Sequence, residues 1–528
     1  MTIPFSYFDL PKEVQISDII RQLQNGLAIE EHPSQRITRV YLDTFDWRLF
    51  AANLQLQCDI ADKTHTYTLR NTDKNRMIAS LRADKSLWMI EDFPESTVKK
   101  HLATVIEMRA LLPVVSLHCQ LHPLTIRNAE QKIVVKLSIE KNHILKNSGK
   151  PGALLNHNLV LQSVRGYPKP FEAAAAYVRD HLHFPPRDQD TYHQALIKLK
   201  IQPGGYSSKP DVPLEPTLRA DLAAKKILLH LLQTMQANEK GVIDDLDSEF
   251  LHDFRVACRR TRSAIGQIKA VFPNKIVEQY KREFAWLQNV TGPTRDLDVY
   301  LLNFRDYKNS VAEHFQNALQ PLHDFLIQQQ SLEQKKLAHA LQTQRYQRLV
   351  SRWQQFLQAP APNRTSAANA TRPIGEVASE RIWKMYKRVI KEGKAITDQS
   401  PPEDLHELRK SCKKLRYLLE FFNRLYPKDE LSQLIKALKQ LQSNLGDFND
   451  LHVQIASLEH YGKQMMEHNP PPAETFLAMG TLIENLDQKQ HALRHEFYAQ
   501  FQQFNAPHYH SLFQQLFTHP SSADTVQQ

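Results

Sequence analysis

The sequence predicts an α+β multidomain protein whose N-terminal part is rich in β-strands and whose C-terminal part is all-α and internally duplicated. Three observations support this fold class. Residues 1–200 contain short runs of alternating apolar and polar residues, residues 215–519 show helical apolar spacing, and one motif in the helical part occurs twice. With 528 residues, 41% of them hydrophobic, the chain is long enough for more than one buried core.

Alternation predicts the strands of the N-terminal part, residues 1–200. The clearest runs cover 53–60, 65–70, 131–140 and 157–164, and turn-forming clusters such as KNSGKPGA separate them. Helices are expected at 16–27, after a first strand, and in the alanine-rich segment 170–183.

A linker is expected at 201–214, because this stretch is rich in glycine and proline and has no periodicity. Helices are expected after it, in a region poor in glycine. The break APAPNRTSAANATRP divides this helical domain, 215–519, into halves of about 215–358 and 374–519, and we expect the tail 520–528 to be disordered. The expected helices are 216–239, 249–271, 275–290, 294–306, 311–357, 375–397, 403–425, 428–444, 448–466, 472–502 and 507–517.

The repeat pairs LHDFRVACRRTR at 251–262 with LHELRKSCKKLR at 405–416, 154 residues later. The same register continues without a gap for nearly fifty residues, so that Pro273 aligns with Pro427 and Gly292 with Gly446. The sequence therefore predicts two copies of one helical unit, packed as bundles about a pseudo-twofold axis.

Each copy places cations on one face of a helix. At 100° per residue, a histidine and three cations of each copy fall within an arc of about 80°, and apolar residues fall opposite. We call these residues the central stripe: His252, Arg255, Arg259 and Arg262 in the first copy, and His406, Arg409, Lys413 and Arg416 in the second. Cys258 and Cys412 lie toward the core side and are expected to be packing residues.

The alternative interpretation is an ordinary solvated basic face. Like charges four residues apart repel each other, and surface helices usually offset this with acidic residues. No acidic residue occurs from 254 to 270 or from 408 to 419, and the arrangement occurs twice. These features favour an anion-binding surface over a solvated face.

Further cations are candidates for the same surface. Some adjoin the stripe in sequence and others lie on the helices that precede it, where they would form a basic groove if those helices pack beside the stripe. They are Arg260, Lys410, Lys414, Arg219, Lys225, Lys226, Arg381, Lys384, Arg388 and Lys391.

Phosphate is the anion that suits these cations, since arginine binds its oxygens in a bidentate manner and lysine adds a mobile point charge. Aromatic residues, on which single-stranded nucleic acid usually stacks, are nearly absent; only Tyr417 adjoins the stripe. The pattern favours a polymer of phosphate alone, bound with a strong salt dependence.

Composition excludes several other classes. Lys and Arg number 67 against 57 acidic residues, a net charge of +10 that favours anionic partners. The four cysteines form no CxxC pair, which argues against a zinc ribbon or a disulfide framework, and no apolar run is long enough for a membrane span. We expect no cofactor, no metal, no membrane partner and a cytoplasmic location, with no secretory signal at the N-terminus.

The doubled stripe, with TRDLD at 294–298 and LGDFNDL at 445–451, resembles the CHAD family over roughly 215–519. The resemblance implies two four-helix-type bundles about a pseudo-twofold axis, binding of inorganic polyphosphate in a basic central groove, and association with polyphosphate granules.

The N-terminal part resembles a CYTH domain, an antiparallel β-barrel that binds triphosphate in a tunnel. The resemblance rests on VYLDTFDWRLFAANLQLQ (40–57), TYTLR (66–70) and VRGYPKPFEAAAAYV (164–178). The ExExK signature is missing from IPFSYFDLP (3–11), Gln55 and Gln57 replace arginines, and Val134 and Ser138 replace carboxylates. Metal-assisted hydrolysis needs several carboxylates, so we expect a degenerate barrel without catalytic residues.

The sequence thus predicts a non-catalytic polyphosphate-binding protein. Two alternatives stay open: a triphosphatase or polyphosphatase that uses the CYTH-like domain, and a nucleic-acid-binding protein, which the lack of aromatic residues disfavours.

Overall fold

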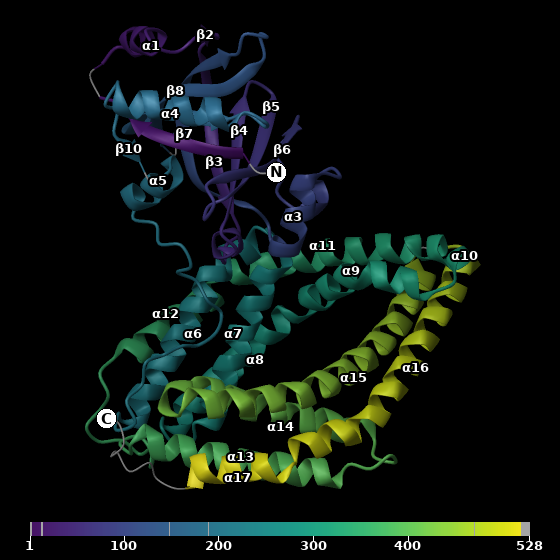
Figure 1. Ribbon diagram of the computed structural model, residues 1–528. Coiled ribbons are helices and arrows are strands. Elements are labelled where there is room, and N and C mark those ends of the chain that lie inside the picture. The colour runs from purple at the N-terminus through teal and green to yellow at the C-terminus, as the bar shows by residue number, and fades with distance from the viewer. Residues whose placement is uncertain (1–2, 12–13, 147, 188, 469, 519–528) are drawn as a thin grey trace. The chain divides into compact units, whose positions relative to one another are not determined.

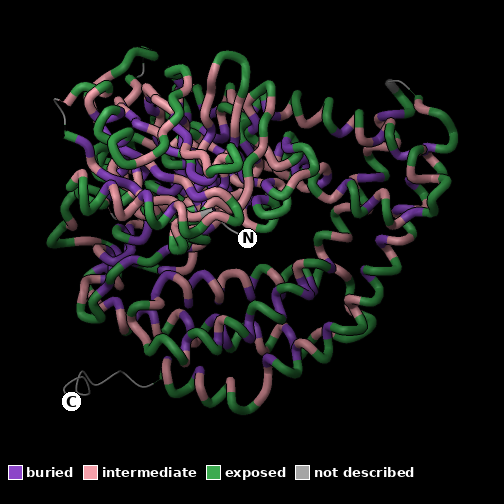
Figure 2. The backbone as a smooth tube through the Cα atoms, turned by 45° about the horizontal axis from the view of Figure 1, so that its top comes forward, coloured by how far each residue is buried: buried purple, intermediate pink, exposed green. Residues whose placement is uncertain are grey.

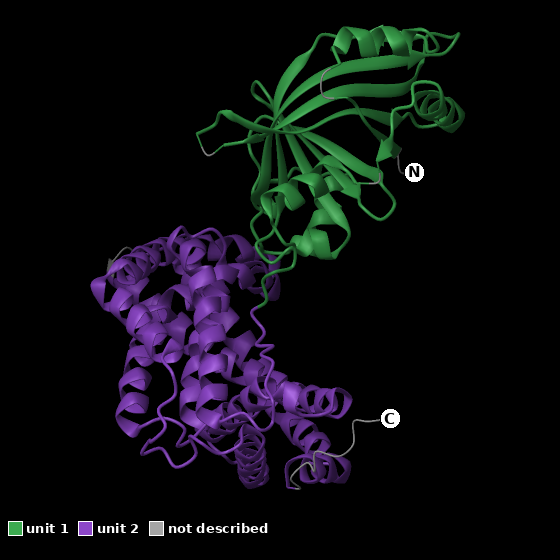
Figure 3. Ribbon diagram, turned by 90° about the vertical axis from the view of Figure 1, so that its left-hand side faces the viewer, with its two compact units in different colours: residues 1–207 green, residues 208–528 purple. Residues whose placement is uncertain are grey.

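The computed structural model describes residues 3–11, 14–146, 148–187, 189–468 and 470–518. The chain divides into two compact units, residues 1–207 and 208–528 (Figure 3). The tail that we predicted to be disordered, 520–528, lies outside the described residues.

The first unit is a closed antiparallel β-barrel. Eight of the described strands pair in the order β1-β6-β5-β4-β3-β7-β8-β9, and β1 pairs again with β9, so the sheet has no free edge there. The predicted antiparallel barrel is therefore confirmed. The strands are β1 Ile3–Asp9, β2 Ile29–Glu31, β3 Gln35–Asp43, β4 Leu54–Ala61, β5 Thr64–Asn71, β6 Arg76–Ala83, β7 Leu112–Arg127, β8 Ile133–Leu145, β9 Pro151–Ser163 and β10 Pro186–Arg187.

Helices cover the outside of the barrel. Apolar residues of α1 and α4 form one core cluster with residues of β7, β8 and β9, which include Val135, Ile139 and Leu159. The strands therefore alternate between this outer core and the barrel interior. The helices of the unit are α1 Ile16–Gln24, α2 Arg48–Ala51, η1 Ile90–Asp92, α3 Thr97–Ile106, α4 Pro168–Asp180 and α5 Thr191–Leu199.

The described part of the second unit is helical apart from its connections (Figure 1). Its long helices alternate between buried and exposed residues along their length, as amphipathic helices do (Figure 2). Its elements are α6 Ala220–Ile243, α7 Ser248–Gln267, α8 Asn274–Val290, α9 Gly292–Ser310, α10 Glu313–Gln316, η2 Asn317–Leu319, α11 Gln320–Gln342, α12 Gln344–Gln358, α13 Ile374–Ala395, α14 Pro402–Phe421, η3 Asn423–Leu425, α15 Lys428–His468, α16 Ala473–Phe504 and α17 Pro507–Thr518.

A pseudo-twofold axis relates the two halves of this unit. Arg219 forms an isolated antiparallel bridge with Pro373, its own equivalent in the repeat. The amide of Ala220 donates to the Arg372 carbonyl at 2.9 Å, and the amide of Ile374 donates to the Leu218 carbonyl at 2.8 Å. Each hydrogen bond is the twofold image of the other under the 154-residue offset, so the axis passes through this bridge and the predicted duplication is confirmed.

The arms of the two halves meet at their far ends. In Figure 1 the pair α9 and α11 and the pair α15 and α16 converge near α10. One hydrophobic cluster joins them there, with Phe304 and Leu322 from the first half and Met465 and Leu482 from the second. The halves are thus packed together both at the axis and at the tips of the arms.

Two predicted helix boundaries are wrong. The single helix expected at 311–357 is broken, because Thr343 adopts an extended conformation and its side chain caps α12 by accepting from the Tyr346 amide. The break expected within 428–466 is absent, since α15 runs through Gly446. In the first half Pro293 lies in the first turn of α9, where it lacks an N–H, but the equivalent Asp447 keeps its N–H and lets the helix continue.

Within the described residues, none of the helices combines the length and the apolar character that a bilayer span requires.

Candidate functional site

The central stripe lies on α7 and α14, which pack against each other. Asp247 starts α7 by accepting hydrogen bonds from the amides of Glu249 and Phe250. Opposite the stripe, α7 and α14 bury their apolar faces. Cys258 and Cys412 are fully buried there, so the prediction that they are packing residues is confirmed.

In the first half, two arginines of the stripe contact the junction of α8 and α9. Arg255 donates to the Gln288 carbonyl at 3.0 Å and to the Thr291 hydroxyl at 2.8 Å. Arg262 donates to the side-chain oxygen of Gln288. All of these acceptors are neutral, so none of these hydrogen bonds offsets the positive charge of either guanidinium group.

In the second half, Arg409 donates to the Asp450 carboxylate at 2.8 Å, with Asp450 itself 60% exposed. The equivalent pair in the first half, Arg255 and Asp296, forms no hydrogen bond in the described residues. An ion pair this exposed is weak, and a multivalent anion can compete for the arginine.

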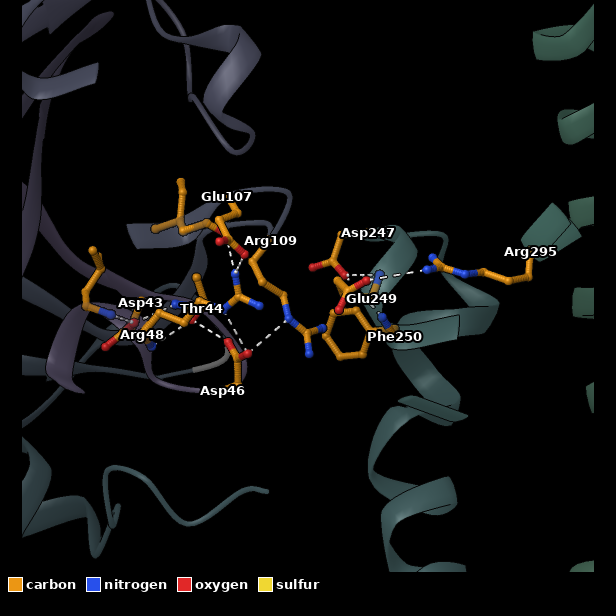
Figure 4. A network of polar contacts seen from close by, with 12 residues as sticks. Asp43, Thr44, Asp46, Arg48, Glu107, Arg109, Asp247, Glu249, Phe250 and Arg295 are labelled. Atoms are coloured by element: carbon orange, nitrogen blue, oxygen red, sulfur yellow. Dashed lines mark hydrogen bonds and ion pairs between the residues drawn. The ribbon is translucent and has the colours of Figure 1, made fainter. Parts of the chain in front are cut away.

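The two histidines of the stripe are held in equivalent positions by different partners. Arg295 donates to Nδ1 of His252 at 3.0 Å. Arg295 also points toward Glu249 at the start of α7, 3.8 Å away (Figure 4). Nδ1 of His406 contacts the side-chain oxygen of Asn449, the repeat equivalent of Arg295. In both halves, therefore, the residue that contacts Nδ1 of the histidine occupies the same position in the repeat.

Arg259 and Lys413 are repeat equivalents near the axis. Both side chains are half-buried, and neither forms a hydrogen bond or an ion pair with any described residue. Burial lowers the pKa of Lys413 to about 8, and the nearby charges of Arg409 and Arg259 add to this effect. Two cations are thus held close together without an internal counter-charge.

Several arginines of the stripe also bury an Nε–H group that has no hydrogen-bond partner. They are Arg255, Arg259, Arg409 and Arg416, and they come from both halves. Buried donors in folded proteins are nearly always satisfied, so these Nε–H groups leave part of the hydrogen-bonding capacity of the stripe unmet.

The last arginine of the second copy differs from the rest of the stripe, because Glu420 follows it on the same helix. Arg416 lies 3.5 Å from Glu420, which also accepts from Arg260 at 2.8 Å. Arg260 is buried and donates in addition to the Ser208 carbonyl. Arg260 therefore joins the two halves through an internal ion pair and does not extend the open part of the stripe.

The preceding helices place three predicted cations elsewhere. Arg219 pairs with Asp221, and Lys225 donates to the carbonyl of Ala359 at the end of α12. Arg381 donates to the carbonyl of Gln267 at the end of α7. Cations at helix C-termini offset the exposed carbonyls, so Lys225 and Arg381 stabilise the fold and are not brought onto the stripe.

The other predicted cations are more open to solvent. Most of them form a second group, which we call the outer set: Lys384, Arg388 and Lys391 on α13, and Lys410 and Lys414 on α14. Within it, Arg388 pairs with Glu392, and Lys410 with Glu407. Burial, and then Arg388, lowers the pKa of Lys414. Lys226 is exposed on α6.

The sequence analysis missed the residues that hold the stripe in place. Gln288, Thr291, Arg295 and Asn449 position its arginines and histidines, and Glu420 neutralises its end. The signal for Arg295 and Asn449 was present, since they are equivalent in the repeat and lie 43 residues after their histidines. Gln288 and Thr291 gave no such signal.

The barrel interior holds two carboxylates, Asp59 and Glu140, which we did not single out from the sequence. Arg39 donates to both, at 2.9 Å and 2.8 Å. A divalent metal needs several free carboxylate oxygens, so this pair does not fit a metal site. No group of three or more possible metal ligands occurs within the described residues.

Part of the helical unit is similar to a known protein family. Residues 226–459 match the family model of the CHAD domain. An uncharacterized protein of Mycobacterium tuberculosis is 25% identical over 295 residues, which covers 53% of this chain and 52% of that relative. The chain thus spans about half the length of this relative.

Two solved structures are similar to parts of the chain. The CHAD domain from the plant Ricinus communis is 27% identical, with a TM-score of 0.47, and the match covers 56% of this chain and 95% of that one. A putative adenylyl cyclase from Hippeastrum, described as having a dominant triphosphatase activity, is 10% identical, with a TM-score of 0.26, over 39% of this chain and 100% of that one.

Proposed function

We propose that this chain, whose residues 226–459 match the CHAD family model, binds inorganic polyphosphate along the central stripe of α7 and α14. The proposal rests above all on Arg259 and Lys413, two cations of equivalent position that are close together and have no partner among the described residues. Holding like charges together is unfavourable, and a bound anion would reverse this cost.

Phosphate oxygens match the donors of the stripe. Guanidinium groups donate to them in a bidentate manner, and Arg259 and Arg262 of the first half and Arg409 and Arg416 of the second carry such groups on half-buried side chains. The cations of the stripe extend through both halves, which suits a chain of phosphates better than a single ion. Polyphosphate binding should also bring the protein to polyphosphate granules.

Nucleic acid is the weaker candidate for this surface. Tyr417, the aromatic residue next to the stripe, is buried and already contacts Arg260 and Arg416 through its ring. It therefore cannot serve as a stacking platform for bases.

We propose further that the barrel does not hydrolyse triphosphate. Arg39 engages both Asp59 and Glu140, so neither carboxylate is available to a catalytic metal. Incubation of the protein with tripolyphosphate and Mg²⁺ or Mn²⁺ should release no phosphate above the rate of a boiled sample. Turnover that is lost in Glu140→Gln would instead support the triphosphatase alternative.

The binding experiment compares two polyanions. Fluorescently labelled long-chain polyphosphate and single-stranded DNA of similar length are titrated with the full chain at physiological salt. We expect polyphosphate to bind at least tenfold more tightly, with an affinity that falls steeply as salt increases. Equal or tighter binding of DNA would contradict the proposal.

A further inference from the structure

The β-barrel encloses a cavity of about 320 Å³ that the proposed polyphosphate site does not use. Residues from all eight strands of the barrel, β1 and β3 to β9, line it. Its volume is at the lower end of the range for small-molecule sites. The question is which ligand its lining would accept.

One part of the cavity is closed by an internal ion-pair network. Arg39 bridges Asp59 of β4 and Glu140 of β8, and all three side chains line the cavity. The side chain of Arg39 is 9% exposed and that of Glu140 is 7% exposed. Because these charges satisfy one another, they attract neither a metal ion nor a large anion.

A second arginine, Arg70, keeps an open donor. Its guanidinium stacks over the Phe5 ring, 4.1 Å from the centroid, and donates through Nη2 to Asn75 at 2.8 Å. Its buried Nε–H has no partner. Arg70 is only 7% exposed, so this donor lies in the cavity lining rather than in bulk water.

Two hydroxyl groups of the lining are open as well. The buried side-chain oxygen of Ser138 has no hydrogen-bond partner in the described residues. The phenol of Tyr7 lies beside Arg70, whose charge and hydrogen bond act to lower the pKa of Tyr7, but the Tyr7 O–H proton has no acceptor among the described residues. Burial raises the pKa of Tyr7 to about 12, so its phenol keeps its proton at neutral pH and can donate it. Val160 pairs with Tyr7 on one side and with Ser138 on the other, which places the two hydroxyl groups at one level of the barrel.

Lys136 adds a positive charge one level away. Lys136 of β8 is the cross-strand partner of Gln162 of β9, and Gln162 is in turn the cross-strand partner of Phe5 of β1. Lys136 therefore lies at the same height in the barrel as Phe5, the ring on which Arg70 stacks. No described residue forms a hydrogen bond or an ion pair with Lys136. The lining itself holds three cations and two carboxylates, which is one net positive charge, and the nearby carboxylate of Asp190 also interacts with Arg70.

The remaining walls are mostly apolar. Phe5, Met77, Leu121 and Val160 all line the cavity. A polyphosphate carries several charges, and placing it against such walls would strip its water without enough cations to compensate. A ligand with an apolar body and a single negative charge fits the same lining.

We infer that the barrel cavity binds a small organic carboxylate, with its carboxylate at Arg70 and Lys136 and its apolar body against Phe5 and Val160. The hydroxyl groups of Tyr7 and Ser138 donate to the ligand's oxygens. This site is separate from the central stripe and does not depend on polyphosphate binding.

Isothermal titration calorimetry of the full chain tests the inference with phenylacetate, hexanoate and the neutral analogue phenylacetamide. At least one carboxylate should bind with 1:1 stoichiometry, and phenylacetamide should bind at least tenfold more weakly than phenylacetate. Arg70→Gln should weaken carboxylate binding at least tenfold, because it removes the positive charge. Arg82→Gln, an exposed arginine of β6, is the matched control and should have no effect.

A second variant guards against misfolding of Arg70→Gln. Val160→Phe reduces the space for the ligand and keeps every charge, so it should abolish binding while far-UV circular dichroism stays unchanged. The double variant Arg259→Glu/Lys413→Glu should bind the carboxylate normally, which separates this site from the polyphosphate site. The inference is overturned if neither carboxylate binds, if binding survives both barrel variants, or if tripolyphosphate competes for the cavity.

Discussion

Arg259 on α7 and Lys413 on α14 are equivalent residues of the two repeats, close enough that the charge of Arg259 helps to lower the pKa of Lys413. No described residue offsets either charge with a hydrogen bond or an ion pair. By contrast, Arg260, the next residue on α7, donates through Nη2 to the carboxylate of Glu420 and through Nη1 to the Ser208 carbonyl. Of these two neighbouring arginines, Arg260 therefore stabilises the fold and Arg259 remains available to a ligand.

The pKa of Lys413 predicts that polyphosphate binding takes up a proton. Burial lowers this pKa to about 8, so at pH 8.5 most of the Lys413 side chains of the free protein are neutral. A bound polyanion favours the charged form and raises the pKa. Calorimetry at pH 8.5 in two buffers of different ionisation enthalpy should show uptake of most of one proton, and less at pH 7.5. Lys413→Arg, which stays charged, should abolish the uptake; an unchanged uptake would exclude Lys413 as its source.

The same pKa predicts how stability depends on pH. The unfolded chain binds more protons at Lys413 than the folded chain between pH 8 and about 10.4, so this residue makes stability rise with pH in that window. Below pH 8 its unfavourable contribution is complete. Lys413→Met should therefore raise the free energy of unfolding most at pH 7 and progressively less up to pH 10, as measured by urea denaturation. A gain that grows with pH would contradict this sign.

Glu420 is predicted to matter for stability and not for binding. Glu420→Gln leaves the buried guanidinium of Arg260 without its counter-charge, which should lower the free energy of unfolding by about 3 kcal/mol. Polyphosphate affinity, measured below the melting transition, should change less than threefold. Glu403→Gln, an exposed acid near the start of the same helix, is the control for the loss of one negative charge. A large gain in affinity would show that Glu420 normally shields the stripe.

The central stripe and the outer set can be separated by neutralisation. Arg259→Gln/Lys413→Gln should weaken polyphosphate binding at least tenfold and reduce the slope of log affinity against log salt by about 1.4. Arg388→Gln/Lys391→Gln removes the same charge from the exposed face of α13 and should weaken binding less than threefold. The reverse order would move the binding surface to the outer set.

The two histidines are predicted to be different tautomers. Arg295 can only donate, so Nδ1 of His252 accepts and its proton is on Nε2. Nδ1 of His406 faces the carbonyl oxygen of Asn449 and carries the proton. Nitrogen NMR of selectively labelled histidine at pH 7.5 should distinguish the two rings. The same tautomer at both positions would show that the repeat is more symmetric than the contacts indicate.

The sequence predicted the features that depend on local periodicity. The duplicated helices, the cation face and the buried cysteines all follow from spacing within α7 and α14, and the twofold bridge at Arg219 and Pro373 keeps the predicted offset. The closed barrel followed from a family resemblance, because alternation alone does not tell how a sheet closes.

Ion pairs and hydrogen bonds between residues far apart in the chain could not be predicted from the sequence. Arg260 and Glu420 are 160 residues apart, and only packing of the two halves brings them together. Likewise, Arg381 and Arg388 lie on the same helix and look alike in the sequence. Only the packing of the halves shows that Arg381 donates to the end of α7 whereas Arg388 is exposed. Continuity of α15 depended on a single position, since Asp447 stands where the first copy has Pro293.

Charge reversal at the axis tests the central claim most directly. Polyphosphate affinity of Arg259→Glu/Lys413→Glu is compared with that of Lys335→Glu/Lys489→Glu, which makes the same change of net charge at exposed positions of α11 and α16. With the helical circular dichroism of both variants unchanged, we predict that the first variant loses binding and that the second keeps it within threefold of the unmodified protein. Equal affinity of the two variants would contradict the assignment of the central stripe as the polyphosphate site.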